Sequence, residues 1–216
     1  MIDPHWYVKA DFFYENDRLF DDMERGKYEV YIGEYAVITE ANMNAALAEA
    51  AFLTGVERNS DLVKMASYAP LLENHNRKDW PTNLIWFDNE KVMGRASYYV
   101  QKMYAHNRPA YNVPFTMAEG PSSASRHYMA VGYDELKGEV IMKVVNATDK
   151  EYTPEIHFNG GNLAEEGTVI TLSAADKTEE NTMENPCKIV PRTSTHKGFG
   201  ANFNYTFQPH SFTILR

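Results

Sequence analysis

The stretch Tyr28-Glu-Val-Tyr-Ile-Gly-Glu-Tyr-Ala-Val37 decides the first half of the fold. Its apolar and aromatic residues run almost without interruption, as expected of a strand that is covered on both faces. Helix formers follow from Asn42 to Thr54 and predict a helix that stops at Gly55. A further strand is predicted at Leu62 to Tyr68. Strand, helix and strand in this order indicate parallel strands joined by a helical crossover.

The same alternation extends to both sides of this segment. Ile2 to Val8 are aromatic and β-branched and predict a strand, and apolar residues from Phe12 to Met23 recur at near-helical spacing. A loop from Glu73 to Asn83 and a short apolar stretch, Leu84 to Phe87, then lead to a predicted helix at Ala96 to His106. Three strand–helix units do not close a barrel, because a closed barrel needs eight. We therefore expect further units upstream.

The pattern changes after Pro109, where short strand-like runs alternate with Gly, Asn and Pro. The predicted strands are residues 126–131, 139–145, 153–158, 168–172, 203–207 and 211–215. Short strands in this number predict an all-β sandwich. The predicted fold class is thus α/β plus all-β, with part of a (β/α)8 barrel in residues 1–112 and a β-sandwich in residues 113–216.

Composition excludes several classes of partner. A formal net charge of −9 with no long run of Lys or Arg argues against nucleic acid. No apolar stretch approaches the roughly 20 residues that span a bilayer. The single Cys187 excludes an internal disulfide, and the seven His are scattered without metal-ligand spacing, so we predict neither a metal nor a cofactor. Aromatic residues at 13 % beside many Asn and Asp suit a carbohydrate-facing surface. The cellular compartment is left open.

Several motifs carry a resemblance to a known family. They are Gly33-Glu-Tyr-Ala36 within its strand, the segments 45–61 and 63–71, Phe87-Asp-Asn89, and Lys143-Val-Val-Asn-Ala-Thr148. Together they resemble the last third of the catalytic barrel and the C-terminal β domain of glycoside hydrolase family 51 α-L-arabinofuranosidases. The resemblance implies that Glu34, at the C-terminal end of a barrel strand, is the catalytic nucleophile of retaining hydrolysis.

The resemblance also suggests which residues surround the nucleophile. His5 and Tyr7 are similar to a family His and Tyr that border the nucleophile and the sugar, although they also suit a packed pair at a strand end. A Glu-His pair of the family reads Pro4-His5 here. Trp80 and Asn83 follow the last barrel strand and are predicted to contact the sugar by stacking and hydrogen bonding. Trp80 equally suits a plug that seals the end of the barrel.

The second carboxyl group that retaining hydrolysis requires has no candidate in this chain. In the family it follows an Asn on an upstream strand, and Glu15, Glu40 and Glu73 are interpreted here as solvated charges. The function implied is release of terminal α-L-arabinofuranosyl residues from arabinose-containing polysaccharides. The alternative is a non-catalytic fragment whose β-sandwich is a carbohydrate-binding or structural module. An endo-acting glucanase or xylanase is disfavoured by the Gly-Glu-Tyr-Ala context. We expect the chain alone to be inactive and to self-associate through exposed barrel edges.

Overall fold

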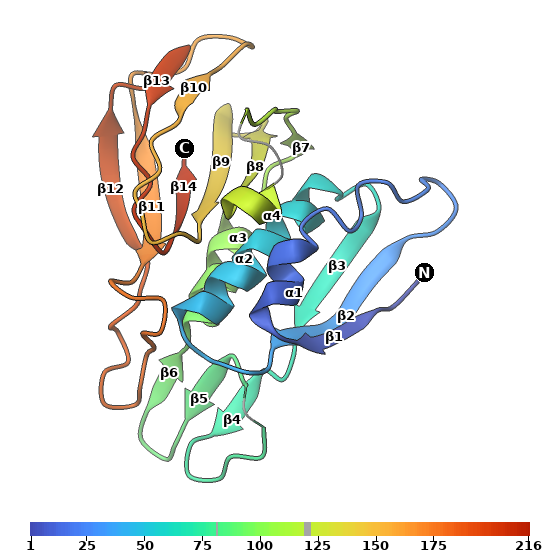
Figure 1. Cartoon of the computed structure of the whole chain (residues 1–216), viewed down its shortest axis with the longest axis vertical. Helices are drawn as coiled ribbons and strands as arrows, with labels where there is room; N and C mark the ends of the chain where they lie inside the picture. The colour runs from blue at the N-terminus through green and yellow to red at the C-terminus, as the bar shows by residue number, and fades with distance from the viewer. Residues whose placement is uncertain (81, 119–121) are drawn as a thin grey trace.

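The N-terminal half is built on a small parallel sheet (Figure 1). The structure, a computed structural model, describes residues 1–80, 82–118 and 122–216. Strands β1 (His5–Val8), β2 (Val30–Val37) and β3 (Val63–Tyr68) lie side by side in that order, and helices α1 (Ala10–Glu15) and α2 (Met43–Arg58) connect them. The parallel strands and helical crossovers predicted from sequence are therefore present. β1 pairs with β2 so that His5 lies opposite Glu34.

Helix α2 is the centre of the molecule, and nearly all of its residues from Met43 to Gly55 are buried. It begins at Asn42, whose side chain accepts a hydrogen bond from the backbone N–H of Ala45 at 3.2 Å. The prediction that it stops at Gly55 is wrong, because it continues to Arg58. Position 55 has no room for a side chain, because a Cβ there would lie 1.8 Å from the carbonyl oxygen of Asp17. The glycine marks a close backbone approach and not a helix end.

The first helix is shorter than its apolar spacing predicted. α1 ends at Glu15, where the Asn16 side chain donates a hydrogen bond to the carbonyl of Phe12 at 2.7 Å. The chain then turns so that Asp17 becomes buried and accepts a hydrogen bond from the Ser122 hydroxyl at 2.8 Å. The segment that was predicted to continue the helix thus contacts a segment far away in the sequence.

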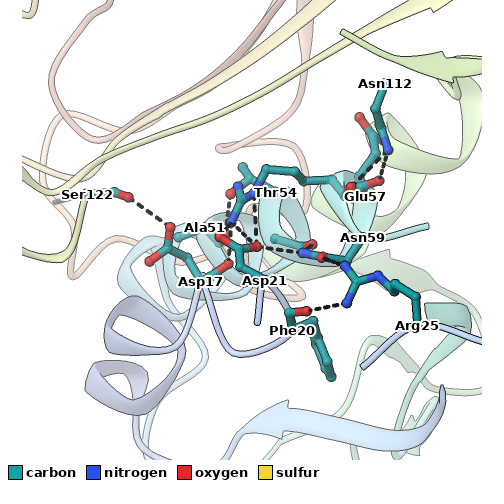
Figure 2. A network of polar contacts seen from close by, with 12 residues as sticks. Asp17, Phe20, Asp21, Arg25, Ala51, Thr54, Glu57, Asn59, Asn112 and Ser122 are labelled. Atoms are coloured by element: carbon teal, nitrogen blue, oxygen red, sulfur yellow. Dashed lines mark hydrogen bonds and ion pairs between the residues drawn. The ribbon is translucent and has the colours of Figure 1, made fainter. Parts of the chain in front are cut away.

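A polar network fastens the loop after α1 to the C-terminal end of α2 (Figure 2). The Asn59 amide donates to Asp21 at 2.7 Å and its carbonyl oxygen accepts from Arg25 at 2.5 Å. The Asn112 amide donates to the backbone carbonyl of Glu57 at 3.0 Å. The network therefore joins three segments that are far apart in the sequence.

A second small sheet precedes the last helix of this half. Its strands β4 (Leu72–Asn74), β5 (Ile85–Phe87) and β6 (Val92–Gly94) lie in chain order, and α3 (Ala96–His106) follows. The predicted helix is confirmed with both bounds. The segment from Glu73 to Asn83, predicted as a loop, begins with most of β4, which is short and carries only one buried residue, Glu73.

The C-terminal half is rich in sheet, as predicted. A six-stranded sheet has the order β12-β11-β14-β9-β8-β7, and a separate pair joins β10 to β13. The bounds are β7 (Tyr111–Asn112), α4 (Ser122–Ser125), β8 (His127–Asp134), β9 (Glu139–Asn146), β10 (Glu155–His157), β11 (Glu166–Ser173), β12 (Arg192–Lys197), β13 (Asn202–Asn204) and β14 (Ser211–Leu215). Strand β12 was not predicted, because its sequence is polar and five of its six residues are exposed at the edge of the sheet.

One hydrophobic core runs through both halves. Buried Phe52 and Val100 belong to the same cluster as Tyr128 and Phe212, and a second cluster lies between the two C-terminal sheets. Helices α1 and α2 occupy the space between the parallel sheet and the six-stranded sheet (Figure 1). Strand β7 pairs with β8, so the last residues of the segment 1–112 take part in the C-terminal sheet. No helix in the described parts of the chain is long and apolar enough to cross a bilayer.

Candidate active site

Two neighbouring parallel strands bring the predicted nucleophile together with its predicted neighbours. The Tyr7 hydroxyl on β1 donates a hydrogen bond to Oε2 of Glu34 on β2 at 2.5 Å. Nδ1 of His5 lies 3.7 Å from the same oxygen. His5 and Tyr7 are two residues apart, so both side chains leave β1 on the same face. The Glu34 side chain keeps 43 % of its surface exposed, which leaves the carboxylate open to a ligand.

A second acidic residue, Asp3, completes the group, although no sequence motif pointed to it. Its Oδ1 accepts a hydrogen bond from the backbone N–H of Gly33 at 2.9 Å and lies 3.3 Å from Nε2 of His5. A Cβ on residue 33 would come within 2.3 Å of that oxygen. The glycine before Glu34 therefore makes room for Asp3 and His5. The available signal was Asp3-Pro-His5 itself, an acidic side chain two residues before a candidate site histidine.

The hydrogen bond keeps its polarity over a wide pH range. Burial, followed by the hydrogen bond to the Glu34 carboxylate and its charge, raises the pKa of Tyr7 to about 12. Tyr7 thus stays protonated at physiological pH and acts as a donor. The bond fixes one oxygen of Glu34 and leaves the other free for chemistry.

Trp80 lies against this pair. Its ring centroid is 5.4 Å from that of Tyr7, and the indole is 48 % exposed. An exposed indole face next to a carboxylate suits the apolar C–H face of a sugar ring. Trp80 also lines a hollow of about 430 Å³ with Ala41, Lys78, Asp79, Trp86, Arg95 and Glu180.

Asn83 is placed differently from the other predicted residues. It is only 3 % exposed, and its amide donates to Oε2 of Glu73 at 2.7 Å. The interpretation of Glu73 as a solvated charge is wrong, because this side chain is 5 % exposed. Direct contact between Asn83 and a sugar stays a prediction that the burial of its amide does not favour. Among the described residues, no three His, Cys, Asp or Glu side chains form a group able to hold a metal ion.

Comparison with known proteins places this chain in a family. The family model "Alpha-L-arabinofuranosidase C-terminal domain" matches residues 33–211, which is most of the chain. The chain belongs to this family. The resemblance to family 51 arabinofuranosidases predicted from the Gly33–Ala36 motif is thus confirmed, and the matched range begins one residue before Glu34.

The curated relatives of this α-L-arabinofuranosidase domain carry consistent names. α-L-Arabinofuranosidase 2 of Arabidopsis thaliana is 30 % identical over 98 % of this chain and 32 % of its own length. The probable α-L-arabinofuranosidase A of Aspergillus oryzae is 32 % identical over 99 % of this chain and 33 % of its own length. An extracellular exo-α-L-arabinofuranosidase of Streptomyces chartreusis is 39 % identical over 63 % of this chain and 18 % of its own length.

Solved structures agree with this assignment. The arabinose-bound MgGH51 α-L-arabinofuranosidase matches 99 % of this chain and 36 % of its own, with a TM-score of 0.90 and 31 % identity. The α-L-arabinofuranosidase of Thermotoga maritima, in its arabinose complex, shares the fold over 87 % of this chain with a TM-score of 0.68 and 18 % identity. The chain spans about a third of the length of the plant and fungal relatives.

Proposed function

We propose that this chain is the C-terminal part of a retaining α-L-arabinofuranosidase with Glu34 as its nucleophile. The observation that carries the proposal is the exposed Glu34 carboxylate, held through one oxygen by Tyr7 on the neighbouring parallel strand. The names of the relatives and the arabinose in the MgGH51 structure support this substrate class. The products are terminal α-L-arabinofuranosyl residues released from arabinan, arabinoxylan or arabinogalactan side chains.

The chemistry assigned to Glu34 follows from its geometry. The free carboxylate oxygen attacks the anomeric carbon, the glycosidic bond breaks, and a glycosyl ester forms on Glu34. A second carboxyl group, about 5–5.5 Å away, must give a proton to the leaving oxygen and then take one from the water that cleaves the ester. We assign that group to a segment of the enzyme outside this chain. Tyr7 and His5 hold and orient the nucleophile, and Trp80 offers its exposed face to the sugar.

The architecture proposed for the whole enzyme gives this site its setting. We infer that β1, β2 and β3 with their helices, within residues 1–112, are the last three units of a (β/α)8 barrel, and that residues 113–216 form a β-sandwich. Active sites of such barrels lie toward the C-terminal ends of the strands, and Glu34 lies in the C-terminal half of β2, three residues before its end. Ile2 beside β1 and Met65 on β3 are 47 % and 52 % exposed, as suits surfaces that further strands would cover. In isolation these edges favour self-association.

The alternative proposal is a non-catalytic fragment with a carbohydrate-binding or purely structural β-sandwich. Calorimetric titration of the whole chain with arabino-oligosaccharides, with and without the substitution Trp80→Ala, distinguishes the two proposals. Binding that survives this substitution favours the sandwich as the binding module. Binding that is lost with Trp80 favours the site next to Glu34.

A trapping experiment on the full-length enzyme tests the main proposal. A fluorinated arabinofuranoside with a good leaving group should label the peptide that contains Glu34, as measured by mass spectrometry after digestion. Glu34→Gln should abolish both labelling and turnover, because an amide is not a nucleophile here. Glu29→Gln is the matched control, since Glu29 is exposed immediately before the same strand. Labelling on another carboxylate, or full turnover by Glu34→Gln, would disprove the assignment.

A further inference from the structure

The loop that carries Trp80 is fastened from two sides although the indole itself is half-exposed. The Thr82 hydroxyl donates to the carbonyl of Val37 at 2.8 Å, and the Asn83 amide donates to the carbonyl of Trp80 at 3.4 Å. Val37 is the last residue of β2, three positions after Glu34. The strand that bears the nucleophile and the loop that bears the aromatic wall are thus tied together directly.

A buried amide–carboxylate pair anchors the same loop. Asn83 and Glu73 are 3 % and 5 % exposed, and the amide donates to Oε2 of Glu73 at 2.7 Å. Burying a carboxylate is costly unless it is hydrogen-bonded or paired with a cation. Arg95, itself 3 % exposed, donates to the backbone carbonyl of Asn83 at 3.5 Å, and its charge lies close enough to Glu73 to interact with it. A buried, hydrogen-bonded carboxyl group thus lies at the base of the loop that carries the half-exposed Trp80.

We propose that Asn83 and Glu73 form a positioning pair that holds Trp80 against the ring of Tyr7 and so fixes the wall of the site beside Glu34. The contacts close a ring. Glu34 binds Tyr7, Tyr7 packs on Trp80, and Thr82, two positions after Trp80, donates a hydrogen bond to Val37 on the strand of Glu34. The part of this inference that concerns the sugar rests on the proposed function, whereas the placement of Trp80 does not. Asn83 acts through Trp80 and not by touching substrate.

Nuclear magnetic resonance on the 216-residue chain tests the placement without any assay of activity. The chain has three Trp, so its indole N–H signals are few and are assigned by Trp80→Phe. In the parent chain a cross-peak should join the rings of Trp80 and Tyr7. Asn83→Asp places a second carboxylate against Glu73, and repulsion should abolish that cross-peak and shift the Trp80 signal. Asn89→Asp introduces the same charge at an exposed position and should leave both unchanged.

A polarity swap guards against loss of the fold. In the double variant Glu73→Gln with Asn83→Asp, the new amide donates to the new carboxylate, so the 2.7 Å hydrogen bond between the two side chains is restored in the opposite direction, whereas the longer 3.4 Å bond to the Trp80 carbonyl is not. We expect the cross-peak between Trp80 and Tyr7 to return. An unchanged cross-peak in Asn83→Asp, or its continued absence in the swapped variant, overturns the proposal. Glu34→Gln should keep the cross-peak, so a failed nucleophile assignment and a failed positioning pair give different results.

Discussion

The hydroxyl of Tyr7 donates a hydrogen bond of 2.5 Å to Oε2 of Glu34 between adjacent parallel strands. The parallel register explains the contact, since His5 is opposite Glu34 and Tyr7 is two residues further along the same face. An acceptor that is charged strengthens such a bond. The pair therefore fixes the carboxylate while leaving it exposed.

Tyr7→Phe should lower kcat/KM of the full-length enzyme by about 10- to 100-fold, because a hydrogen bond to a charged group contributes about 1.5–3 kcal/mol. The ring is kept, so its packing on Trp80 is preserved. The measurement is hydrolysis of an aryl α-L-arabinofuranoside. Tyr111→Phe is the control, because Tyr111 makes a similar 3.0 Å hydrogen bond to Glu135 at an exposed position. Equal rates for the two variants would contradict the role of Tyr7.

Gly33→Ala should reduce activity strongly but change stability little. The added methyl group meets the side-chain ends of Asp3 and His5, at 2.3 Å and 2.8 Å, and these can turn away. The cost to folding should be about 1 kcal/mol, at the low end for overpacking, while the groups beside Glu34 are displaced. Thermal unfolding and kcat/KM should be measured together. Gly200→Ala, where a Cβ meets no atom within 4 Å, should alter neither.

Gly55→Ala, in contrast to Gly33→Ala, should mainly lower the stability of the fold. Alanine gains about 1 kcal/mol of helix propensity over glycine, but the new Cβ would lie 1.8 Å from the Asp17 carbonyl oxygen, which belongs to the backbone and cannot swing aside. Overpacking of this kind costs about 1–3 kcal/mol or more, so the net change should be a loss. Urea unfolding of the 216-residue chain is the measurement. A more stable Gly55→Ala chain would show that the loop after α1 is free to move.

Elements with strong local patterns could be predicted from the sequence. The prediction failed where contacts with distant segments determine the structure. Strand β2 was predicted from its continuous apolar run, and α3 from its helical spacing. The end of α2 was misplaced because Gly55 is required by the close approach of the Asp17 backbone and not by a helix end. No local sequence pattern contains that contact. Strand β12 escaped prediction because an exposed edge strand needs no apolar alternation.

The candidate site, too, was predicted only where neighbouring strands or a motif determine it. The resemblance selected Glu34, His5 and Tyr7, and parallel pairing of two predicted strands is enough to bring them together. The burial of Glu73 follows from its partner Asn83, ten residues away across a loop. A carboxylate in a polar loop is usually solvated, so its sequence context alone favours the wrong interpretation.

Glu49 should make the chain less stable as pH rises from about 4.5 to about 7. Complete burial, opposed by weaker hydrogen bonds and by Arg95, raises the pKa of this carboxyl to about 7. In that pH window the folded chain keeps a proton that the unfolded chain releases, so stability falls by about 1.4 kcal/mol per pH unit and is constant above it. Glu49→Gln should flatten this slope while its carbonyl still accepts from the Val37 N–H. Urea unfolding at several pH values, with Glu29→Gln as the exposed control, provides the test. An unchanged slope in Glu49→Gln would assign the pH dependence to other groups.

The 216-residue chain alone should show no measurable arabinofuranosidase activity. The proposed acid/base carboxyl lies outside it, and general acid–base catalysis contributes a factor of about 10² to 10⁴. The larger loss is positional, because three strands carry only part of the loops that would hold the sugar ring in line with Glu34. The assay is release of an aryl group from an α-L-arabinofuranoside by the purified chain, with Glu34→Gln as control. Turnover that this substitution removes would mean that the chain, alone or as an assembly of copies, completes a working site, and the assignment of the acid/base to another segment would be wrong.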